Sequence, residues 1–413
     1  MDSASSKQLK ALIIAPTVTG SISFIASLTI VIMIHRSNVK LSTTYRRLIF
    51  AVSCFDLIQS LTQASSTLPM PAGMVWGAIG NDITCDFQGF FTVIGASGAM
   101  LYSVSISVYF LLVIKFNVSN ERIKQRYEPF LHAVPIIYSL TTSLWVFTTG
   151  GYNPAGTICW IANEPLNCDK DPDVDCVTTL IKLKGWVAAG TPYLGAFLLN
   201  CVIMFVLWFA EYSNFRRTRN HRLSFIASPS TPRNETENQD EEEGAVTRCL
   251  GCLARIKYLR LSSRPTDNVG LSPLAAHLSR PSNAAMRRRR SITNRALAYI
   301  IGYLMTYLFS FIYRFWEGYG NEVPFIIIFL TRLLYPLQGF FNVVIYSYPH
   351  VLNTRQKFPE YSWFKAFWEV VHSGGDNDQL PTTKRSRRRS SAAARRLNFP
   401  VQQTGPATHL ENG

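Results

Sequence analysis

The stretch LLYPLQGFFNVVIY, residues 333–346, decides the fold. It lies in the last of seven long apolar segments, and it mixes a proline, a glycine, a glutamine and an asparagine with nonpolar residues. In lipid, a helix tolerates proline and glycine where neighbouring helices or polar side chains satisfy the freed backbone groups. Gln338 and Asn342 are four residues apart and share one helix face, and Pro336 removes a backbone hydrogen bond. The stretch therefore predicts a kinked membrane helix whose polar side faces a bundle and which can move at the kink.

The composition agrees with a membrane protein. The chain has 413 residues, of which 47% are hydrophobic and 13% aromatic, and its formal net charge is +15. The apolar residues are gathered into long runs almost without charge, which is typical of membrane-spanning helices. No basic module interleaved with aromatic residues is present, so nucleic acid is not an expected partner. The first run, residues 11–34, is too long for a cleavable signal core and predicts the first membrane helix.

We expect an all-α polytopic membrane protein built as a seven-helix bundle. The expected spans are residues 11–34, 48–68, 87–114, 129–149, 185–210, 296–313 and 323–346. Residues 1–10 form a short leader, and residues 11–349 form the transmembrane domain, within which residues 211–295 are expected to be a long disordered loop. Residues 350–371 carry aromatic and basic side chains and predict a helix on the membrane surface. Residues 372–413 have the composition of a disordered basic tail.

Lysine and arginine in the short loops predict the orientation. The first and third loops carry four each, whereas the second carries none. The first, third and fifth loops and the C-terminus are therefore expected to be cytosolic, and the N-terminus extracellular, in a multi-pass protein of the plasma membrane. Asn117 begins a glycosylation sequon in the third loop and is expected to be unused in this orientation.

Four cysteines fall outside the cell in this orientation, where disulfides form. They are Cys85, Cys159, Cys168 and Cys176. Three pairings are possible. A bridge between Cys85 and Cys159 would hold the second outer loop over the mouth of the bundle, and Cys168 with Cys176 would then close a small loop.

Several motifs resemble the seven-helix G-protein-coupled receptor superfamily. Cys85 at the outer start of helix three and Cys159 in the second outer loop belong to its general frame. The stretch QGFFNVVIY, residues 338–346, is similar to the helix-seven signature of secretin- and adhesion-type receptors and of the cyclic-AMP receptors of slime moulds. CDFQGFF at residues 85–91 and SCFDL at residues 53–57 look like the cyclic-AMP-receptor-like group.

The chain also departs from other branches of that superfamily. Helix three ends VIKFN at residues 113–117, without the Asp/Glu-Arg-Tyr switch of rhodopsin-type receptors, and helix seven has neither Asn-Pro-x-x-Tyr nor a lysine to hold retinal. The ten-residue leader lacks the hormone-binding ectodomain of secretin-type receptors. The resemblance implies a receptor that passes the signal of a small extracellular ligand to a heterotrimeric G protein.

Four cationic side chains near the outer half of the expected bundle are candidate ligand contacts: Arg332, Arg314, Lys182 and Lys184. A charge inside a membrane helix is a functional candidate, so Arg332 meets either an anionic ligand group or a structural partner, which would be Asp56 or a cluster of carbonyls. Arg314 can instead form an interfacial ion pair with Glu317, three residues further on. The lysines either steer an anion or flank the membrane.

A second group of residues is a candidate activation network: Asp56, Pro336, Gln338, Gly339, Asn342 and Tyr346. Asp56 is costly to bury alone and needs a partner, a proton or a cation. By residue type, Asn342 and Ser107 are its candidate partners. The network either links inactive and active states or forms a static hydrogen-bonded plug.

The cytosolic side offers basic and phosphorylatable residues. Six basic side chains near the bilayer are expected to attract anionic lipid and, by the resemblance, to face a G protein: Arg46, Arg47, Lys115, Arg126, Arg216 and Arg217. Arginine runs before Ser291, and before Ser390 and Ser391, are typical of kinase sites, which makes kinases and arrestin-like proteins candidate partners. The alternative is that these runs are solvated charge.

Two other function classes fit less well. A seven-span transporter or channel for a small anionic solute would be expected to show a repeat between its halves, and none is evident. A membrane enzyme needs clustered polar catalytic groups at one depth, and we find no such group. We therefore expect no enzymatic activity, cofactor or metal site.

Overall fold

The computed structural model describes residues 6–162, 178–226, 283–318 and 323–375. The chain divides into two compact units, residues 1–207 with 293–413, and residues 208–292. Seven helical segments of the described chain are long and apolar enough to span a membrane. The protein is therefore an all-α, polytopic bundle, as the apolar runs predict.

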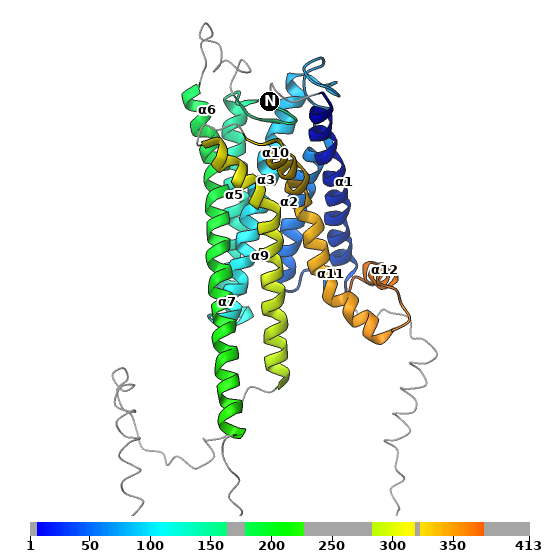
Figure 1. The fold of residues 1–413 in the computed structure, drawn as a ribbon, viewed down its shortest axis with the longest axis vertical. Coiled ribbons are helices and arrows are strands. Elements are labelled where there is room, and N and C mark those ends of the chain that lie inside the picture. The colour runs from blue at the N-terminus through cyan, green and yellow to red at the C-terminus, as the bar shows by residue number, and fades with distance from the viewer. Residues whose placement is uncertain (1–5, 163–177, 227–282, 319–322, 376–413) are drawn as a thin grey trace, which may run out of the picture. The chain divides into compact units, whose positions relative to one another are not determined.

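The helices follow one another along the chain with short connections between most of them (Figure 1). They are α1 (Ser6–Arg36), α2 (Thr44–Ser65), α3 (Asp82–Ile114), α4 (Asn120–Arg122), η1 (Ile123–Tyr127), α5 (Glu128–Thr148), α6 (Thr178–Gly185), η3 (Trp186–Gly190), α7 (Thr191–Ile226), α9 (Asn283–Gly318), α10 (Phe325–Leu334), η5 (Tyr335–Leu337), α11 (Gln338–Lys357) and α12 (Trp363–Ser373). Two short strands, β1 (Tyr152–Pro154) and β2 (Cys159–Ile161), pair antiparallel after α5.

Polar side chains fix where several helices begin. The Thr43 hydroxyl accepts a hydrogen bond from the Arg46 backbone N–H at the start of α2. At the start of α3, Asn81 and Thr84 form a reciprocal capping box. Such caps satisfy backbone N–H groups that have no partner inside the helix.

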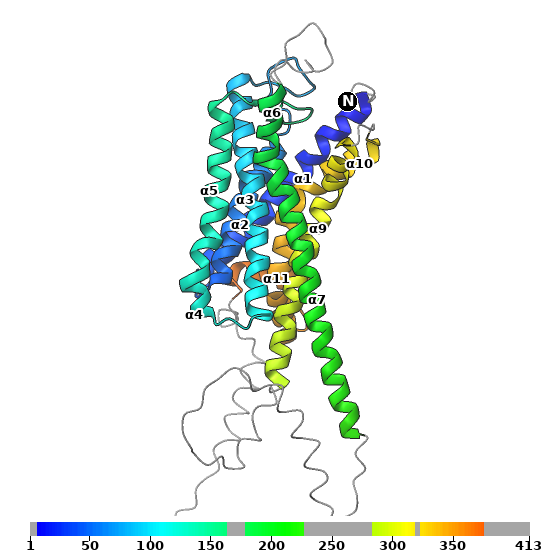
Figure 2. The same cartoon turned by 90° about the vertical axis from the view of Figure 1, so that its left-hand side faces the viewer.

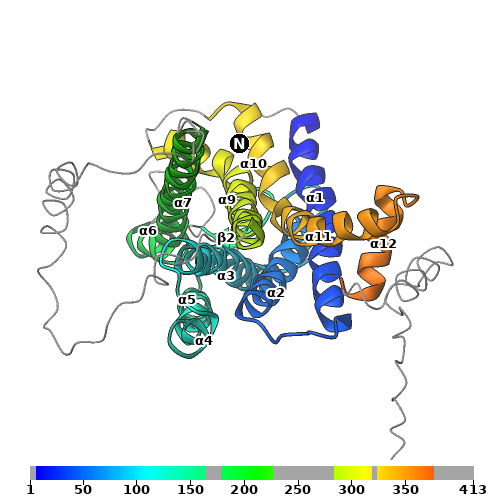
Figure 3. The ribbon, with the colours of Figure 1, turned by 90° about the horizontal axis from the view of Figure 1, so that it is seen from below.

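The first three helices pack closely because small residues lie at their contacts. A Cβ on Gly20 of α1 would lie 2.8 Å from the Ala64 backbone nitrogen of α2, and a Cβ on Gly95 of α3 would lie 2.7 Å from that of Gln59. Glycine at such positions lets helices approach more closely than larger residues do. Figure 2 shows α2, α3 and α5 beside one another. Seen from below, α11 lies between α1 and α9, and α12 lies next to α1 (Figure 3).

Many large apolar side chains are exposed on the outer faces of the helices. Phe130 and Ile137 of α5 are 68% and 60% exposed, and Phe205 of α7 is 63% exposed. In a soluble protein such surfaces would be unfavourable. They suit helices that are surrounded by hydrocarbon.

Two helices are longer than the apolar runs suggest. The sixth spanning helix, α9, passes Arg314 and continues to Gly318, since an arginine near a membrane surface can extend its charge to water. α7 continues to Ile226, and no glycine or proline interrupts it after Ala196. Both ends of the expected disordered loop, residues 211–226 and 283–295, are therefore helical, and the rest of that loop lies outside the described residues.

The expected surface helix at residues 350–371 is divided. Its first part continues α11 to Lys357, and α12 begins at Trp363 after a turn. Pro359 explains the break because the residue before a proline is disfavoured in helical conformation. Phe364 on α12 is 76% exposed, in keeping with a helix that lies on a membrane surface.

Candidate functional site: the polar interior of the bundle

Asp56 and Asn342 meet inside the bundle. Asn342 of α11 donates from Nδ2 to Asp56 Oδ2 of α2 at 2.7 Å, and the two residues are 7% and 2% exposed. Asn342 is therefore the partner that residue type suggests. The other candidate, Ser107, donates instead to Asn200 Oδ1 of α7 at 2.5 Å. Within the described chain, no ion pair joins Asp56 to Arg332, and Asp56 Oδ1 has no hydrogen-bond partner.

Gln338 joins α11 to two other helices. Its Nε2 donates to Ser103 Oγ of α3 at 2.7 Å, and its Oε1 accepts a hydrogen bond from the Tyr307 hydroxyl of α9. Gln338 is 4% exposed, so both contacts are shielded from water. A buried amide with both ends bonded fixes the rotation of its helix.

The proline predicted to kink helix seven produces a change of helix type. Residues Tyr335–Leu337 form a single 3₁₀ turn between α10 and α11, and Pro336 is buried in it. Because α11 starts again at Gln338, its first N–H groups lack partners within the helix. The Gly339 N–H donates to Ser23 Oγ of α1 at 3.0 Å.

A small cavity lies next to these contacts. Its lining includes Ser103, Ser107, Tyr299, Tyr303, Gln338 and Asn342. The lining residues come from α3, α9 and α11, so the cavity adjoins the three helices that Gln338 holds together. The hydroxyl and amide groups on its wall are suited to hold an ordered water molecule.

An aromatic cluster adjoins the same cavity, which Tyr299 also lines. The hydroxyls of Tyr45 on α2 and Tyr299 on α9 are 3.0 Å apart. The Tyr45 ring also contacts Phe110 of α3, and the Arg295 guanidinium lies 5.9 Å from its centre. Tyr346, the last residue of the predicted network, is 3% exposed. The Tyr45–Tyr299 contact is not evident from the sequence, because nothing in either local stretch shows that the two rings face each other.

Arg47, which the sequence predicts to face the cytosol, binds an acidic residue. Its guanidinium binds both carboxylate oxygens of Glu128, with Nη2 donating to Oε2 at 2.7 Å. Thr44 donates to the same Oε2 at 2.6 Å. The pair joins α2 to α5, and the sequence does not reveal it because Glu128 lies 81 residues away.

The other expected cytosolic residues are found in different settings. Arg46 contacts Ser37, whereas Lys115, Arg126 and Ser291 are exposed. Arg216 and Arg217 lie in α7, but their side chains are outside the described part of the structure, as are Ser390 and Ser391.

A disulfide ties α3 to β2. Cys85 at the start of α3 is bonded to Cys159 of β2, which decides among the possible pairings for these two residues. Gln88 supports the bridge because its Oε1 accepts from the Cys159 backbone N–H at 3.0 Å. Cys168 and Cys176 lie outside the described residues.

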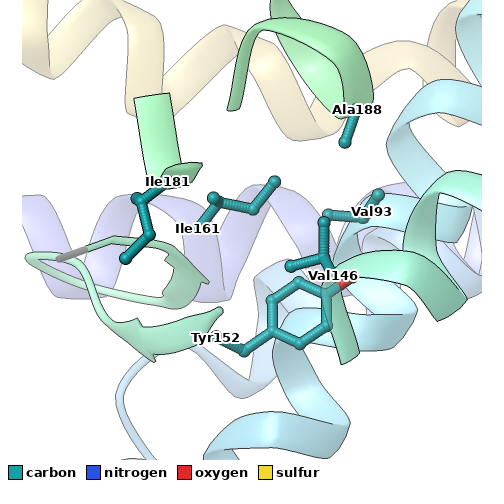
Figure 4. Close-up of a cluster of buried hydrophobic side chains, with 6 residues drawn as sticks. All are labelled: Val93, Val146, Tyr152, Ile161, Ile181 and Ala188. Atoms are coloured by element: carbon teal, nitrogen blue, oxygen red, sulfur yellow. The ribbon is translucent and has the colours of Figure 1, made fainter. Parts of the chain in front are cut away.

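The strands after α5 also rest on an apolar cluster, drawn in Figure 4. Tyr152 of β1 points among Val93, Val146 and Ile161. Its hydroxyl is 2.9 Å from the Ser143 hydroxyl. Burial raises the pKa of Tyr152 above its usual value, which keeps the phenol neutral at physiological pH.

The four cationic ligand candidates are not gathered at one place. Lys184 is 3% exposed and donates to the Thr149 carbonyl at 3.3 Å, so it has a structural partner. Lys182 is exposed on α6. Arg314 is exposed on α9 beside the Tyr313 ring, and the side chain of Glu317 lies outside the described residues. Arg332 is half-buried, and the charged or titratable groups acting on it are Tyr313, Arg314 and Tyr335.

Among the residues that the structure describes, no three histidine, cysteine, aspartate or glutamate side chains lie close enough to hold a metal ion. A comparison with protein-family models finds no match, and a comparison with curated protein sequences finds none either.

Proposed function

We propose that this chain is a receptor that passes the signal of a small extracellular ligand to a heterotrimeric G protein. The coarser description, a seven-span membrane protein suited to a receptor or a transporter, follows from the seven apolar helices. The proposal adds that the chain works by a change in helix arrangement. Its orientation, with the N-terminus extracellular and the C-terminus cytosolic, is part of the proposal and rests on the loop charges.

One observation carries the proposal: the residues just after Pro336 bind four different helices. Gln338 binds α3 and α9, Gly339 binds α1, and Asn342 binds α2. A helix that is broken at one point and held by directional hydrogen bonds on its inner side has discrete arrangements rather than a continuum. A ligand that favours one arrangement would shift the population toward it.

The proposed change in helix arrangement would alter the cytosolic ends of the helices. The Tyr45–Tyr299 contact holds α9 against α2. A movement of α9 away from α2 would therefore break this contact. Exposed basic residues such as Lys115 and Arg126 would then meet anionic lipid and the G protein. Phosphorylation of Ser291 and of the tail serines by kinases, with arrestin-like proteins binding afterwards, belongs to the same proposal.

The test is guanine-nucleotide exchange. The full chain, embedded in membranes with individual Gα subunits and their βγ partners, is presented with a small-molecule panel that includes cyclic nucleotides. We expect ligand-dependent exchange on at least one Gα subunit. The Gln338→Leu variant, which cannot bond to Ser103 or Tyr307, should lose most of that response while still reaching the membrane.

The opposite result is equally clear. Solute uptake into vesicles that hold the chain, together with no exchange on any Gα subunit, would indicate a transporter or channel.

A further inference from the structure

Arg332 is a charge in an apolar helix, and among the described residues it has no acidic partner. It is the only ionisable side chain of α10, whose sequence is FIIIFLTRLL. Across the described residues, no acidic group forms an ion pair with its guanidinium. The charges in membrane helices usually pair with one another or with backbone carbonyls, or mark a ligand path. A guanidinium has five N–H donors and therefore requires acceptors in such a helix.

The helix that carries Arg332 is less tightly packed than its continuation. None of the ten residues of α10 is buried, whereas α11, which follows Pro336, has eight buried residues. The outer half of this spanning segment is thus less buried than the inner half. Arg332 lies in the outer half, in α10 (Figure 1), about one turn before Pro336.

A second guanidinium, that of Arg314, lies near Arg332. Arg314 on α9 is close enough to act on Arg332 electrostatically, and the other groups that do so are the phenols of Tyr313 and Tyr335. A second positive charge nearby makes Arg332 a more favourable site for an anion.

A layer of tyrosine rings lies just inward of this charge. Tyr335 meets Tyr307 edge-on, with ring centres 5.5 Å apart, and Tyr307 in turn contacts Tyr303 at 4.6 Å and Tyr193 at 5.6 Å. Aromatic faces and edges favour a flat ring laid against them. The layer is linked to the polar contacts below it, because Tyr307 donates to Gln338.

We infer that Arg332 binds the anionic group of a small ligand, a carboxylate or a phosphate ester, whose flat apolar body lies on the tyrosine layer. Arginine is well suited to this role because its planar fork binds two oxygens of one anion at once. The inference rests on the proposed function, since it names the chemistry of that receptor's ligand. The anion would bind Arg332, and the body of the ligand would contact Tyr335, the residue before Pro336.

Probe binding to the purified full chain tests the inference. The chain is placed in nanodiscs of pure phosphatidylcholine, and binding of phenyl phosphate, benzoate and neutral benzyl alcohol is measured by equilibrium dialysis. We expect the two anions to bind and benzyl alcohol not to bind. Arg332→Gln should weaken anion binding by about tenfold or more, as loss of one charge-assisted contact implies. The matched control Lys124→Gln removes an exposed charge of η1 and should change nothing.

Arg332→Lys guards against a folding defect. Lysine keeps the positive charge, but it lacks the planar guanidinium that binds two oxygens at once. We expect normal thermal unfolding and a several-fold loss of phenyl phosphate affinity. Added phosphatidylserine separates two sources of the anion: if it displaces the probes, the site belongs to a lipid headgroup, and if it does not, the site takes a soluble ligand.

Two results would overturn the inference: no binding of either anion, or equal binding by wild type and Arg332→Gln. The dialysis contains no G protein, so its outcome is independent of nucleotide exchange. Anion binding without exchange would count against the proposed function alone. Exchange driven by neutral or cationic ligands, with no anion binding, would count against Arg332 alone.

Discussion

At the scale of single residues, the Asp56–Asn342 hydrogen bond makes a direct prediction. Asn342→Ala removes the hydrogen bond that holds Asp56 Oδ2 inside the bundle. Leaving a buried acceptor without its donor costs about 1–3 kcal/mol. We therefore expect a lower unfolding temperature for Asn342→Ala in nanodiscs, measured by intrinsic fluorescence.

Exchange of the two side chains provides the control. Asp56→Asn combined with Asn342→Asp restores an amide–carboxylate pair with its direction reversed. The double variant should regain much of the stability lost in Asn342→Ala. Equal unfolding temperatures for wild type and Asn342→Ala would show that the contact does not stabilise the bundle.

Gly339 makes a second prediction, which concerns space. A Cβ at this position would lie 2.0 Å from Ser27 Oγ and 2.9 Å from the Ser23 carbonyl oxygen of α1. Gly339→Ala must push α11 away from α1, and overpacking of this kind costs about 1–3 kcal/mol. We expect a clear loss of thermal stability in the same fluorescence measurement.

A glycine on another helix serves as the comparison. A Cβ on Gly195 of α7 would meet nothing within 4 Å. Gly195→Ala should leave stability unchanged or raise it slightly, since alanine favours a helix by about 1 kcal/mol over glycine. If Gly339→Ala lowers thermal stability no more than Gly195→Ala does, the α1–α11 contact is not tight.

At the scale of elements, the Cys85–Cys159 bridge predicts a non-additive pair of substitutions. The bond joins α3 to β2 across 74 residues of sequence. Cys85→Ser and Cys159→Ser should each lower the free energy of unfolding by about 2–5 kcal/mol. The double variant should lose no more than either single variant, because each change already breaks the bond. Additive losses in thermal unfolding would contradict the pairing.

The contact between α2 and α9 predicts a change in basal activity. Tyr299→Phe keeps the ring but removes the hydroxyl that lies 3.0 Å from the Tyr45 hydroxyl. Losing a hydrogen bond that exists only in the closed arrangement makes opening easier by about 1 kcal/mol. On the proposed function, ligand-free nucleotide exchange should rise several-fold.

The control for that prediction is Tyr348→Phe. Tyr348 of α11 is 53% exposed, and its ring stacks against Trp363. Removal of the Tyr348 hydroxyl should leave ligand-free nucleotide exchange at the wild-type rate. A Tyr299→Phe variant with wild-type basal exchange would remove this contact from the proposed closed arrangement.

The elements show what the sequence predicts well and where it fails. The spans are predictable because long uncharged runs need no knowledge of neighbouring helices. The ends of α7 and α9 are not, because polar residues can continue a helix beyond the apolar run. The division of the expected surface helix at Pro359 follows a local rule that the aromatic pattern conceals.

At the scale of the whole molecule, the orientation is the prediction to test. An epitope tag at the N-terminus should bind antibody on intact cells, and a tag at the C-terminus only after permeabilisation. Asn117 is exposed between α3 and α4, so its local structure does not prevent glycosylation. A glycan on Asn117, detected as a mass change on enzymatic deglycosylation, would show that this loop faces outward.

Distant pairs mark the limit of prediction for the site. Asn342 is identifiable as a partner of Asp56 because strongly polar side chains are scarce inside the spans. Arg47 and Glu128, and likewise Tyr45 and Tyr299, escape prediction because their meeting depends on how each helix is rotated about its axis. Helix rotation is set by packing over the whole bundle and leaves no signal in a local stretch.

The Asp56–Asn342 contact has a consequence for biosynthesis. The two residues are separated by 286 positions, so at ordinary elongation rates Asp56 leaves the ribosome about 15–60 s before its partner does. During that interval the carboxylate is a costly group in a half-built bundle. Insertion of the last helix gives Asp56 its partner Asn342. A chain that stops before residue 342 lacks that partner. The same carboxylate that organises the finished bundle thus distinguishes complete chains from fragments while they are being made.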